Sequence, residues 1–156
     1  MKILQFAFDS GSDNPYLPHN HVKCCVVYTG THDNNTTVGW WESDATENER
    51  RSALEYFGEV KDGIQWAFIR AAFASVATLA VVPVQDVLGL DGEARMNIPS
   101  KPGGNWSWRL AEGALTPELA NKLAALTELT DRDSCVKVAT SATDSPSFAM
   151  SAEFAA

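Results

Sequence analysis

Three short, nearly continuous apolar runs constrain the fold of this chain most strongly. They cover residues 3–8, 25–29 and 79–84 and contain valine, isoleucine, phenylalanine and tyrosine. A strand with one face in water alternates apolar and polar residues, whereas a strand covered on both faces is apolar throughout, as in a parallel sheet. The β-branched and aromatic residues are those that strands favour. The runs therefore predict three parallel strands that are covered on both faces.

Helices are predicted between the second and third runs and after the third. Residues 46–49, Thr-Glu-Asn-Glu, have the capping-box pattern, and Gly58 suits the end of the helix that they open. Small and apolar residues at helical spacing predict a second helix from about 63 to 78. Residues 116–118, Thr-Pro-Glu, open a third helix. This order of strands and helices indicates an α/β fold with right-handed crossovers.

The stretch between the first two runs, residues 9–24, contains two prolines and a glycine, so no long crossover helix fits there. A long irregular loop in a compact domain is usually functional. Three parallel strands cannot close a barrel, and they leave bare edges. We therefore expect residues 1–132 to be part of a larger unit. Ser, Thr, Ala and Asp dominate residues 133–156, for which we expect a disordered tail.

Charge and composition exclude several classes of partner. Twelve Lys and Arg against twenty Asp and Glu give a net charge of -8. Such a chain repels phosphate groups, so we expect neither nucleic acid nor a membrane as a partner. No secretory signal opens the chain, which favours the cytoplasm. The three cysteines are an odd number with two of them adjacent, which indicates reduced thiols rather than a disulfide framework.

Other chemistries are weakly supported. Histidines and cysteines gather early in the chain, at His19, His21, Cys24, Cys25 and His32. They lack the paired spacing of structural zinc sites, so we expect no metal. The chain has no Gly-x-Ser-x-Gly elbow, phosphate-binding loop or dinucleotide-binding fingerprint, so we expect no cofactor either.

Polar residues follow each predicted strand. Asp9 follows the first, His32 and Asp33 the second, and Gln85 and Asp86 the third. In barrels and doubly wound folds, reactive groups lie at the carboxyl ends of parallel strands. The alternative is that Asp simply favours strand-to-loop turns, and the residues alone leave both interpretations open.

His32 and Asp33 are the most specific pair. Neighbouring side chains on an extended chain point in opposite directions and cannot form a dyad. Where a strand ends in a turn, both can reach one pocket, bind vicinal hydroxyl groups and stabilise positive charge on a sugar ring. Trp106 and Trp108, in a Gly-rich polar loop, are candidates for stacking on a sugar, whereas Trp66 is expected in the core.

At this point eight segments resemble the 4-α-glucanotransferases, the family of amylomaltases and disproportionating enzymes. They are Lys-Ile-Leu-Gln-Phe-Ala-Phe at 2–8, Asn-Pro-Tyr-Leu-Pro-His-Asn at 14–20, Val-Tyr-Thr-Gly-Thr-His-Asp-Asn at 27–34, Gly-Trp-Trp at 39–41, Val-Pro-Val-Gln-Asp-Val-Leu-Gly at 82–89, Glu-Ala-Arg-Met-Asn at 93–97, Gly-Asn-Trp at 104–106 and Leu-Thr-Pro-Glu-Leu at 115–119. The resemblance covers residues 1–132 and not the tail.

The resemblance implies a (β/α)8 TIM barrel of the α-amylase clan, of which this chain holds the last three β/α units. It implies retaining transfer of α-1,4-glucan segments between maltodextrins, derived from starch or glycogen, through a covalent glycosyl-enzyme. Asp33 matches the family's third carboxylate, which stabilises the transition state, and His32 matches its hydroxyl-binding neighbour. Asp9 matches the donor side and Asn97 the acceptor loop, both as substrate-binding residues.

The family's nucleophile and acid/base lie on the fourth and fifth strands, which would precede Met1. The resemblance therefore implies that this chain alone is inactive, and that the N-terminal half of the barrel is a possible partner. The alternatives are a non-catalytic carbohydrate-binding or complementation module and a structural remnant. A plastid location remains open if an upstream transit peptide is missing.

Overall fold

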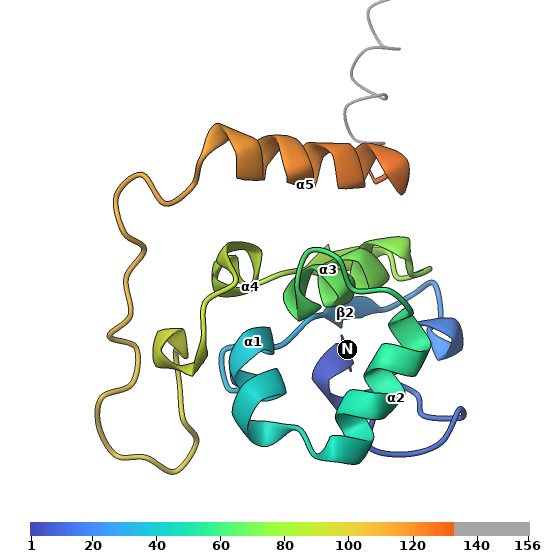
Figure 1. Ribbon diagram of the computed structural model, residues 1–156, viewed down its shortest axis with the longest axis horizontal. Helices are drawn as coiled ribbons and strands as arrows, with labels where there is room; N and C mark the ends of the chain where they lie inside the picture. The colour runs from blue at the N-terminus through green and yellow to red at the C-terminus, as the bar shows by residue number, and fades with distance from the viewer. Residues whose placement is uncertain (133–156) are drawn as a thin grey trace, which may run out of the picture.

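The computed structural model describes residues 1–132, which form an α/β fold around a three-stranded parallel sheet (Figure 1). The strands β1 (Lys2–Ile3), β2 (Val26–Tyr28) and β3 (Leu79–Val81) pair in the order β1-β2-β3, and both pairings are parallel. The predicted parallel strands are therefore confirmed. The expected disordered tail, residues 133–156, lies outside the described residues.

All three strands are shorter than the apolar runs that predicted them, and β1 and β3 fall short by the most residues. The run 3–8 leaves the sheet after β1 as a 3-10 turn, η1 (Leu4–Phe6), and the run 79–84 ends where α4 (Val84–Leu88) begins. Pro83 precedes α4 and has no N–H to donate to a strand partner, so the sheet cannot continue through it. Periodicity alone cannot separate a buried strand from a buried helical turn, which is why the predicted strands were too long.

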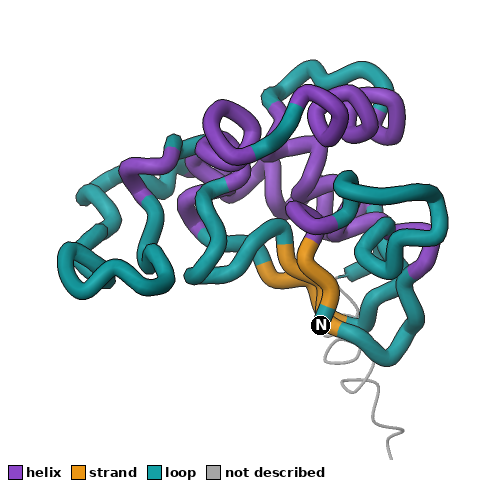
Figure 2. Tube along the Cα trace, turned by 90° about the horizontal axis from the view of Figure 1, so that it is seen from below, coloured by secondary structure: helices purple, strands orange, loops and turns teal. Residues whose placement is uncertain are grey.

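One face of the sheet is covered better than the other. Val27 is fully buried, whereas Val26 and Tyr28, whose side chains point to the opposite face, are half-buried, and Leu79 is exposed. Figure 2 shows the strands side by side with most of the helices on one side of them. Within residues 1–132, the expectation that both faces are covered is met on one face only.

The connection from η1 to β2 is irregular, as expected, and holds only one short 3-10 turn, η2 (Pro18–Asn20). The buried side chain of Asn14 organises this loop by donating to Phe6 O and to the Asp9 carboxylate, each at 2.9 Å. The chain from β2 to β3 passes through α1 (Thr37–Gly39), a π-helical turn η3 (Trp40–Asp44), α2 (Glu47–Phe57) and α3 (Ile64–Ala74).

The predicted start and end of α2 are confirmed. The Thr46 hydroxyl accepts from Glu49 N at 3.2 Å, and the Glu49 carboxylate accepts from Thr46 N at 2.7 Å, which completes the capping box. At Gly58 the chain takes a positive φ of 70°, a conformation that glycine adopts readily. No helix among residues 1–132 is long and apolar enough to cross a membrane.

The other two long helices differ in how well the sequence set their bounds. α3 ends before Ser75, several residues short of the predicted end at 78. The last helix, α5 (Pro117–Leu129), begins where predicted, because the Thr116 hydroxyl accepts from Leu119 N at 3.3 Å. A 3-10 turn, η4 (Gly92–Ala94), lies between α4 and α5.

The core is built on two faces of α3. On one face Phe68 packs against Phe8, Trp40 and Phe57, with ring centroids 5.1–5.6 Å apart. On the other face Trp66 belongs to a smaller cluster made from α3, α4 and α5 (Trp66, Ile69, Val87 and Leu126). The prediction that Trp66 is a core residue is therefore confirmed.

Arg132, just after α5, forms hydrogen bonds with the C-terminal end of α3. Its guanidinium donates to four backbone carbonyls at or just beyond the C-terminus of α3, those of Ala72, Phe73, Ser75 and Ala77, at 2.6–3.4 Å. The last carbonyls of a helix have no partner within the helix, so a cation there satisfies them and complements the helix dipole. Figure 1 shows α5 apart from the sheet; it packs on α3 through Leu126.

Candidate functional site

Two of the predicted site residues, His32 and Asp33, line a hollow of about 480 Å³ beyond the carboxyl ends of β2 and β3. Its wall includes the segment 30–36, which follows β2, the start of α4 and residues 94–96, together with Met1 and the ends of β2 and β3. Carboxyl ends of parallel strands are where α/β folds place their ligands. The polar residues that follow the second and third strands therefore border one cavity.

His32 and Asp33 lie in a turn and their side chains converge. The distance from His32 Nε2 to Asp33 Oδ1 is 3.4 Å, and the two side chains are 56% and 52% exposed. On an extended chain the two neighbouring side chains would point in opposite directions. In this turn both reach the same pocket. An imidazole and a carboxylate in this position can bind adjacent hydroxyl groups.

Asn97 reaches the same place from a distant part of the chain. Its side-chain amide donates to Asp33 Oδ1 at 2.6 Å, and its backbone N–H donates to His32 O at 3.1 Å. Arg95 strengthens the junction by donating to Asp33 O at 2.6 Å and to Asn97 O at 2.9 Å. The structure thus brings three predicted site residues together, and it adds Arg95, which the sequence analysis missed. Arg95 lay inside a motif of the resemblance, but nothing in its spacing indicated this contact.

Trp106 packs against His32. The ring centroids are 5.1 Å apart with an interplanar angle of 40°. Trp106 N donates to Met96 O at 2.7 Å, and Trp106 has a positive φ of 60°, which is uncommon for a bulky residue. Because the residue is still 51% exposed, its indole can offer apolar surface beside the hollow. Neither Trp106 nor Trp108, the other sequence candidate, is among the residues that line the hollow, but Trp106 reaches its edge through the contact with His32.

Asp9 is separate from these residues. It is exposed and absent from the wall of the hollow, and its Oδ1 accepts from Ser10 Oγ and Asn14 Nδ2, each at 2.9 Å. The structure therefore places Asp9 in the irregular loop after η1, apart from the site around Asp33.

Asp86 borders the hollow but is not accessible from it. The residue is 1% exposed, and its carboxylate accepts from Thr37 N at 2.7 Å and from the hydroxyls of Thr29 and Thr37. Burial raises the pKa of Asp86 above its usual range, and the hydrogen bonds from the two threonines oppose that shift. Asp33 is consequently the accessible carboxylate in the wall of the hollow.

Gln5 supports the wall of the hollow from behind. Its Nε2 donates to Asn35 O at 2.9 Å. A Cβ atom at position 30 would lie 2.6 Å from Gln5 Nε2, so this approach requires glycine at Gly30. Gln5 lies in a predicted strand, and its long-range contact had no signal in the sequence.

The early histidines and cysteines do not come together. His19 stacks on Tyr56 and His21 Nε2 bonds to Tyr16 O at 2.9 Å, while burial lowers the pKa of His21. Cys24 is exposed and free. Within the part of the chain that the structure describes, no three His, Cys, Asp or Glu side chains are placed to hold a metal ion.

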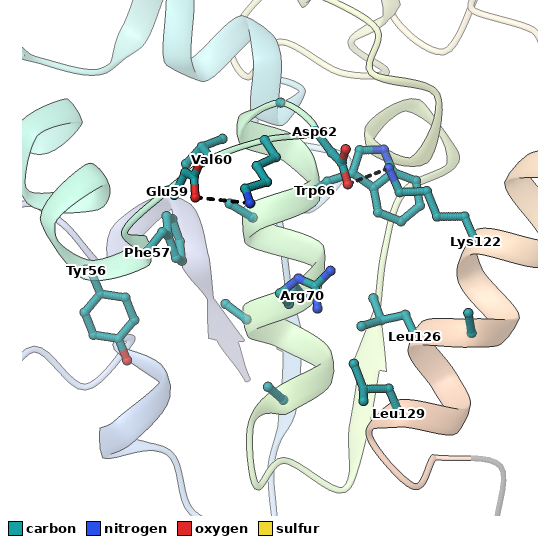
Figure 3. A pocket seen from close by; sticks show the side chains of 16 residues that line it. Tyr56, Phe57, Glu59, Val60, Asp62, Trp66, Arg70, Lys122, Leu126 and Leu129 are labelled. Atoms are coloured by element: carbon teal, nitrogen blue, oxygen red, sulfur yellow. Dashed lines mark ion pairs between the residues drawn. The ribbon is translucent and has the colours of Figure 1, made fainter.

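A second and larger hollow, of about 650 Å³, lies among α2, α3 and α5 (Figure 3). Lys122 Nζ lies 4.0 Å from the centroid of the Trp66 ring and 3.1 Å from the Asp62 carboxylate. Lys122 thus covers the aromatic face that a sugar would need. None of the predicted site residues lies in this hollow, so we place the candidate site at Asp33.

Comparison with known proteins agrees with this fold. A family model described as 4-alpha-glucanotransferase matches residues 1–116. The 4-alpha-glucanotransferase of Thermus thermophilus is 49% identical over an alignment of 140 residues, and the match covers 85% of this chain and 28% of the relative. The DPE1 4-alpha-glucanotransferase of Oryza sativa subsp. japonica, described as chloroplastic/amyloplastic, is 49% identical over 130 residues, 83% of this chain and 22% of the relative.

A solved structure shares the fold as well as the sequence. The amylomaltase of Streptococcus agalactiae, in complex with acarbose, superposes with a TM-score of 0.79 at 32% identity, over 84% of this chain and 27% of that chain. The chain thus spans 22% to 28% of the length of these three relatives. The parallel sheet, the cavity at its carboxyl edge and the match over residues 1–116 together show that the chain belongs to the 4-alpha-glucanotransferase family.

Proposed function

We propose that residues 1–132 form the last three β/α units of the (β/α)8 barrel of a 4-α-glucanotransferase. Three features support this proposal: the strands are parallel and in sequence order, one sheet face is incompletely covered, and β1 and β3 each have a neighbour on one side only among the described residues. A closed barrel has no such edges, because further strands pair with them.

In the complete barrel the activity is the retaining transfer of α-1,4-glucan segments between maltodextrins by double displacement. Asp33 acts as the transition-state stabiliser, since its carboxylate is the accessible negative charge in the hollow and can offset positive charge on the sugar ring. His32 and Asn97 bind hydroxyl groups beside it. The observation that carries this assignment is the convergence of His32, Asp33 and Asn97 within hydrogen-bonding distance at one cavity.

Asp9 keeps its proposed role on the donor side of the substrate. Its carboxylate lies on the loop that follows β1 and η1, at the same end of the sheet as the segment after β2. In the proposed barrel, the glucan would have to extend toward this loop to reach it.

The chain by itself is proposed to be catalytically inactive. A retaining glycosidase mechanism needs two carboxyl groups about 5–5.5 Å apart. In the hollow, Asp33 is accessible and Asp86 is buried beneath the threonines that bond to it. The nucleophile and acid/base would come from an N-terminal half of the barrel, which is the proposed protein partner. No cofactor is required for this chemistry.

A second candidate function is a carbohydrate-binding or complementation module without turnover. The observation in its favour is the exposed indole of Trp106 beside the hydrogen-bonding groups of His32 and Asp33, because sugars bind through a combination of stacking and polar contacts. The two candidates differ in turnover and not in the ligand.

The test uses maltotriose and acarbose with the purified 156-residue chain. We expect acarbose to shift the NMR signals of the His32 ring and the Trp106 indole, and we expect no conversion of maltotriose. Adding a chain with the preceding part of the Thermus thermophilus relative should then produce glucose and longer maltodextrins. Turnover by the chain alone would overturn the assignment of roles, and binding without turnover in the mixture would favour the module.

We propose a cytoplasmic or plastid location. The rice relative is described as chloroplastic/amyloplastic, which supports the plastid.

A further inference from the structure

Three fully buried polar side chains meet where β2, α1 and α4 come together. Thr29 and Thr37 are 0% exposed and Asp86 is 1% exposed. Asp86 Oδ1 accepts from Thr37 N at 2.7 Å, while Oδ2 accepts from Thr37 Oγ1 at 2.9 Å and from Thr29 Oγ1. Among residues 1–132 no other carboxylate is buried.

The two threonines bracket the segment that carries the candidate site. Thr29 directly follows β2, and Thr37 begins α1, so the residues between them are the segment 30–36 with His32 and Asp33. The Asp86 carboxylate therefore ties together the two ends of this segment. α4, which carries Asp86, also leads into the stretch that brings Asn97 to Asp33.

Stability does not account for a carboxylate at this position. All of the donors to Asp86 are neutral, and burial raises the pKa of Asp86, which means that burial disfavours its charged form. An apolar side chain is often at least as favourable as an ion in such a place. A carboxylate does, however, present only acceptors, and so it can take three donors on two oxygens without a competing N–H.

One contact from Gln5 and two contacts within the segment also hold it. Gln5 Nε2 donates to Asn35 O at 2.9 Å, and Asn34 Oδ1 accepts from Thr31 N at 3.0 Å and from Thr31 Oγ1 at 2.7 Å. These contacts leave the tip of the segment, with the His32 and Asp33 side chains, open to the hollow.

We propose that Asp86 is a positioning residue, whose buried carboxylate fixes both ends of the segment 30–36 and thereby the placement of Asp33 against Asn97. This inference rests on the proposed function, because the groups that Asp86 positions are the ones proposed to bind glucan. Asp86 itself does not touch the ligand; it acts through Thr29 and Thr37.

The experiment compares Asp86→Asn, Thr37→Val and Thr46→Val in the 156-residue chain. Asp86→Asn keeps the shape of the side chain but turns one acceptor into a donor that faces two hydroxyls. Thr37→Val removes one of those hydroxyl donors and leaves the backbone bond. Thr46→Val, in the distant cap of α2, lowers stability without touching the segment and is the matched control. The measurements are amide hydrogen exchange by residue, acarbose affinity and the melting temperature.

We expect Asp86→Asn to speed exchange of amides 30–37 about tenfold relative to amides of α3, and to weaken acarbose binding about tenfold. Its melting temperature should stay close to that of the wild type, because the variant also removes a buried charge. Thr37→Val should act in the same direction by a smaller factor. Thr46→Val should lower the melting temperature and leave local exchange and affinity unchanged.

If amides 30–37 of Asp86→Asn exchange at the same rate as in the wild type, the proposal is overturned. Faster exchange of these amides in Thr46→Val would also overturn it, since the effect would then come from lower overall stability. If Asp86→Asn fails to fold, Thr37→Val decides the question by the same criteria. A wild-type chain that does not bind acarbose would contradict the proposed function instead, while the exchange rates would still test Asp86.

Discussion

Asn97 Nδ2 lies 2.6 Å from Asp33 Oδ1, although the two residues are separated by 64 positions in the sequence. The contact joins the segment that follows β2 to the segment that follows η4. It occupies one carboxylate oxygen with a neutral donor and leaves the other oxygen of Asp33 without a side-chain hydrogen bond from a residue of the described part. A ligand hydroxyl can therefore reach Asp33 while its orientation is kept.

This relationship predicts the behaviour of Asn97→Ala. Loss of the amide donor frees the Asp33 side chain to rotate, and the ligand has to immobilise it on binding. We expect acarbose affinity to fall about tenfold, with little change in the melting temperature. The measurement is calorimetric titration of the 156-residue chain. Asn48→Ala, at an exposed position of α2, is the control, and equal losses in both variants would contradict the prediction.

Asp33→Asn tests the role of the charge. In a mixture that restores transfer activity, loss of the transition-state carboxylate should lower the rate of maltotriose disproportionation about 100-fold or more. Acarbose affinity should fall less than the rate, because an amide still bonds to hydroxyl groups. Asp13→Asn, an exposed position in the irregular loop, should keep the wild-type rate. Near-normal transfer by Asp33→Asn would end the assignment.

Trp106→Ala tests the aromatic wall of the site. The substitution removes the ring that packs on His32 and the surface available to a sugar, so we expect acarbose binding to weaken about fivefold to tenfold. Trp108→Ala should bind as the wild type does, since the ring contact with His32 is made by Trp106. Intrinsic fluorescence offers a second readout: acarbose should change the emission of the wild type and of Trp108→Ala but not of Trp106→Ala.

Arg132→Ala should detach the end of α5. Four carbonyls near the end of α3 lose a charged donor, which we expect to lower the free energy of unfolding by about 2 kcal/mol. Urea unfolding checks the loss, and limited proteolysis should cut first within α5. Arg51→Ala, on the exposed face of α2, should be nearly neutral. Unchanged stability of Arg132→Ala would show that the guanidinium contributes nothing to this junction.

Asp86 predicts a pH dependence of stability. Because burial raises its pKa in the folded chain, the folded state binds the Asp86 proton more tightly than the unfolded state does. Its contribution to stability is therefore full below the unfolded pKa of about 4 and is lost as the pH rises through the folded pKa. Relative to Asp86→Asn, the free energy of unfolding of the wild type should fall over that range and then level off.

The comparison of the two proteins across pH removes the titration of all other carboxylates from the difference. A difference in the free energy of unfolding that rises with pH would mean that the folded state holds Asp86 with a lowered pKa, contrary to the geometry described above. Thermal or urea unfolding from about pH 3 to pH 7 covers the window.

Local structure was predictable from the sequence wherever short-range chemistry decides it. The capping box of Thr46 and Glu49, the cap at Thr116 and the positive φ at Gly58 all followed from residues within a few positions of each other. The ends of β3 and α3 were predicted less well. Apolar runs report burial, and burial is shared by a strand, a turn and a helix start, so the position of Pro83 and the packing of the chain set the boundaries.

The candidate site also has features that the sequence predicts and features that only the tertiary structure decides. The sequence determined that His32 and Asp33 follow a strand and that their motif resembles a glucanotransferase family, because these features lie in contiguous residues. Only the tertiary structure decided that Asn97, Arg95 and Trp106 converge on that pair, that Asp9 does not, and that Asp86 is buried beneath two threonines. Hydrogen bonds and ring contacts depend on distances across 60 to 75 positions of chain, and those distances are fixed by the packing of whole strands and helices rather than by any local pattern.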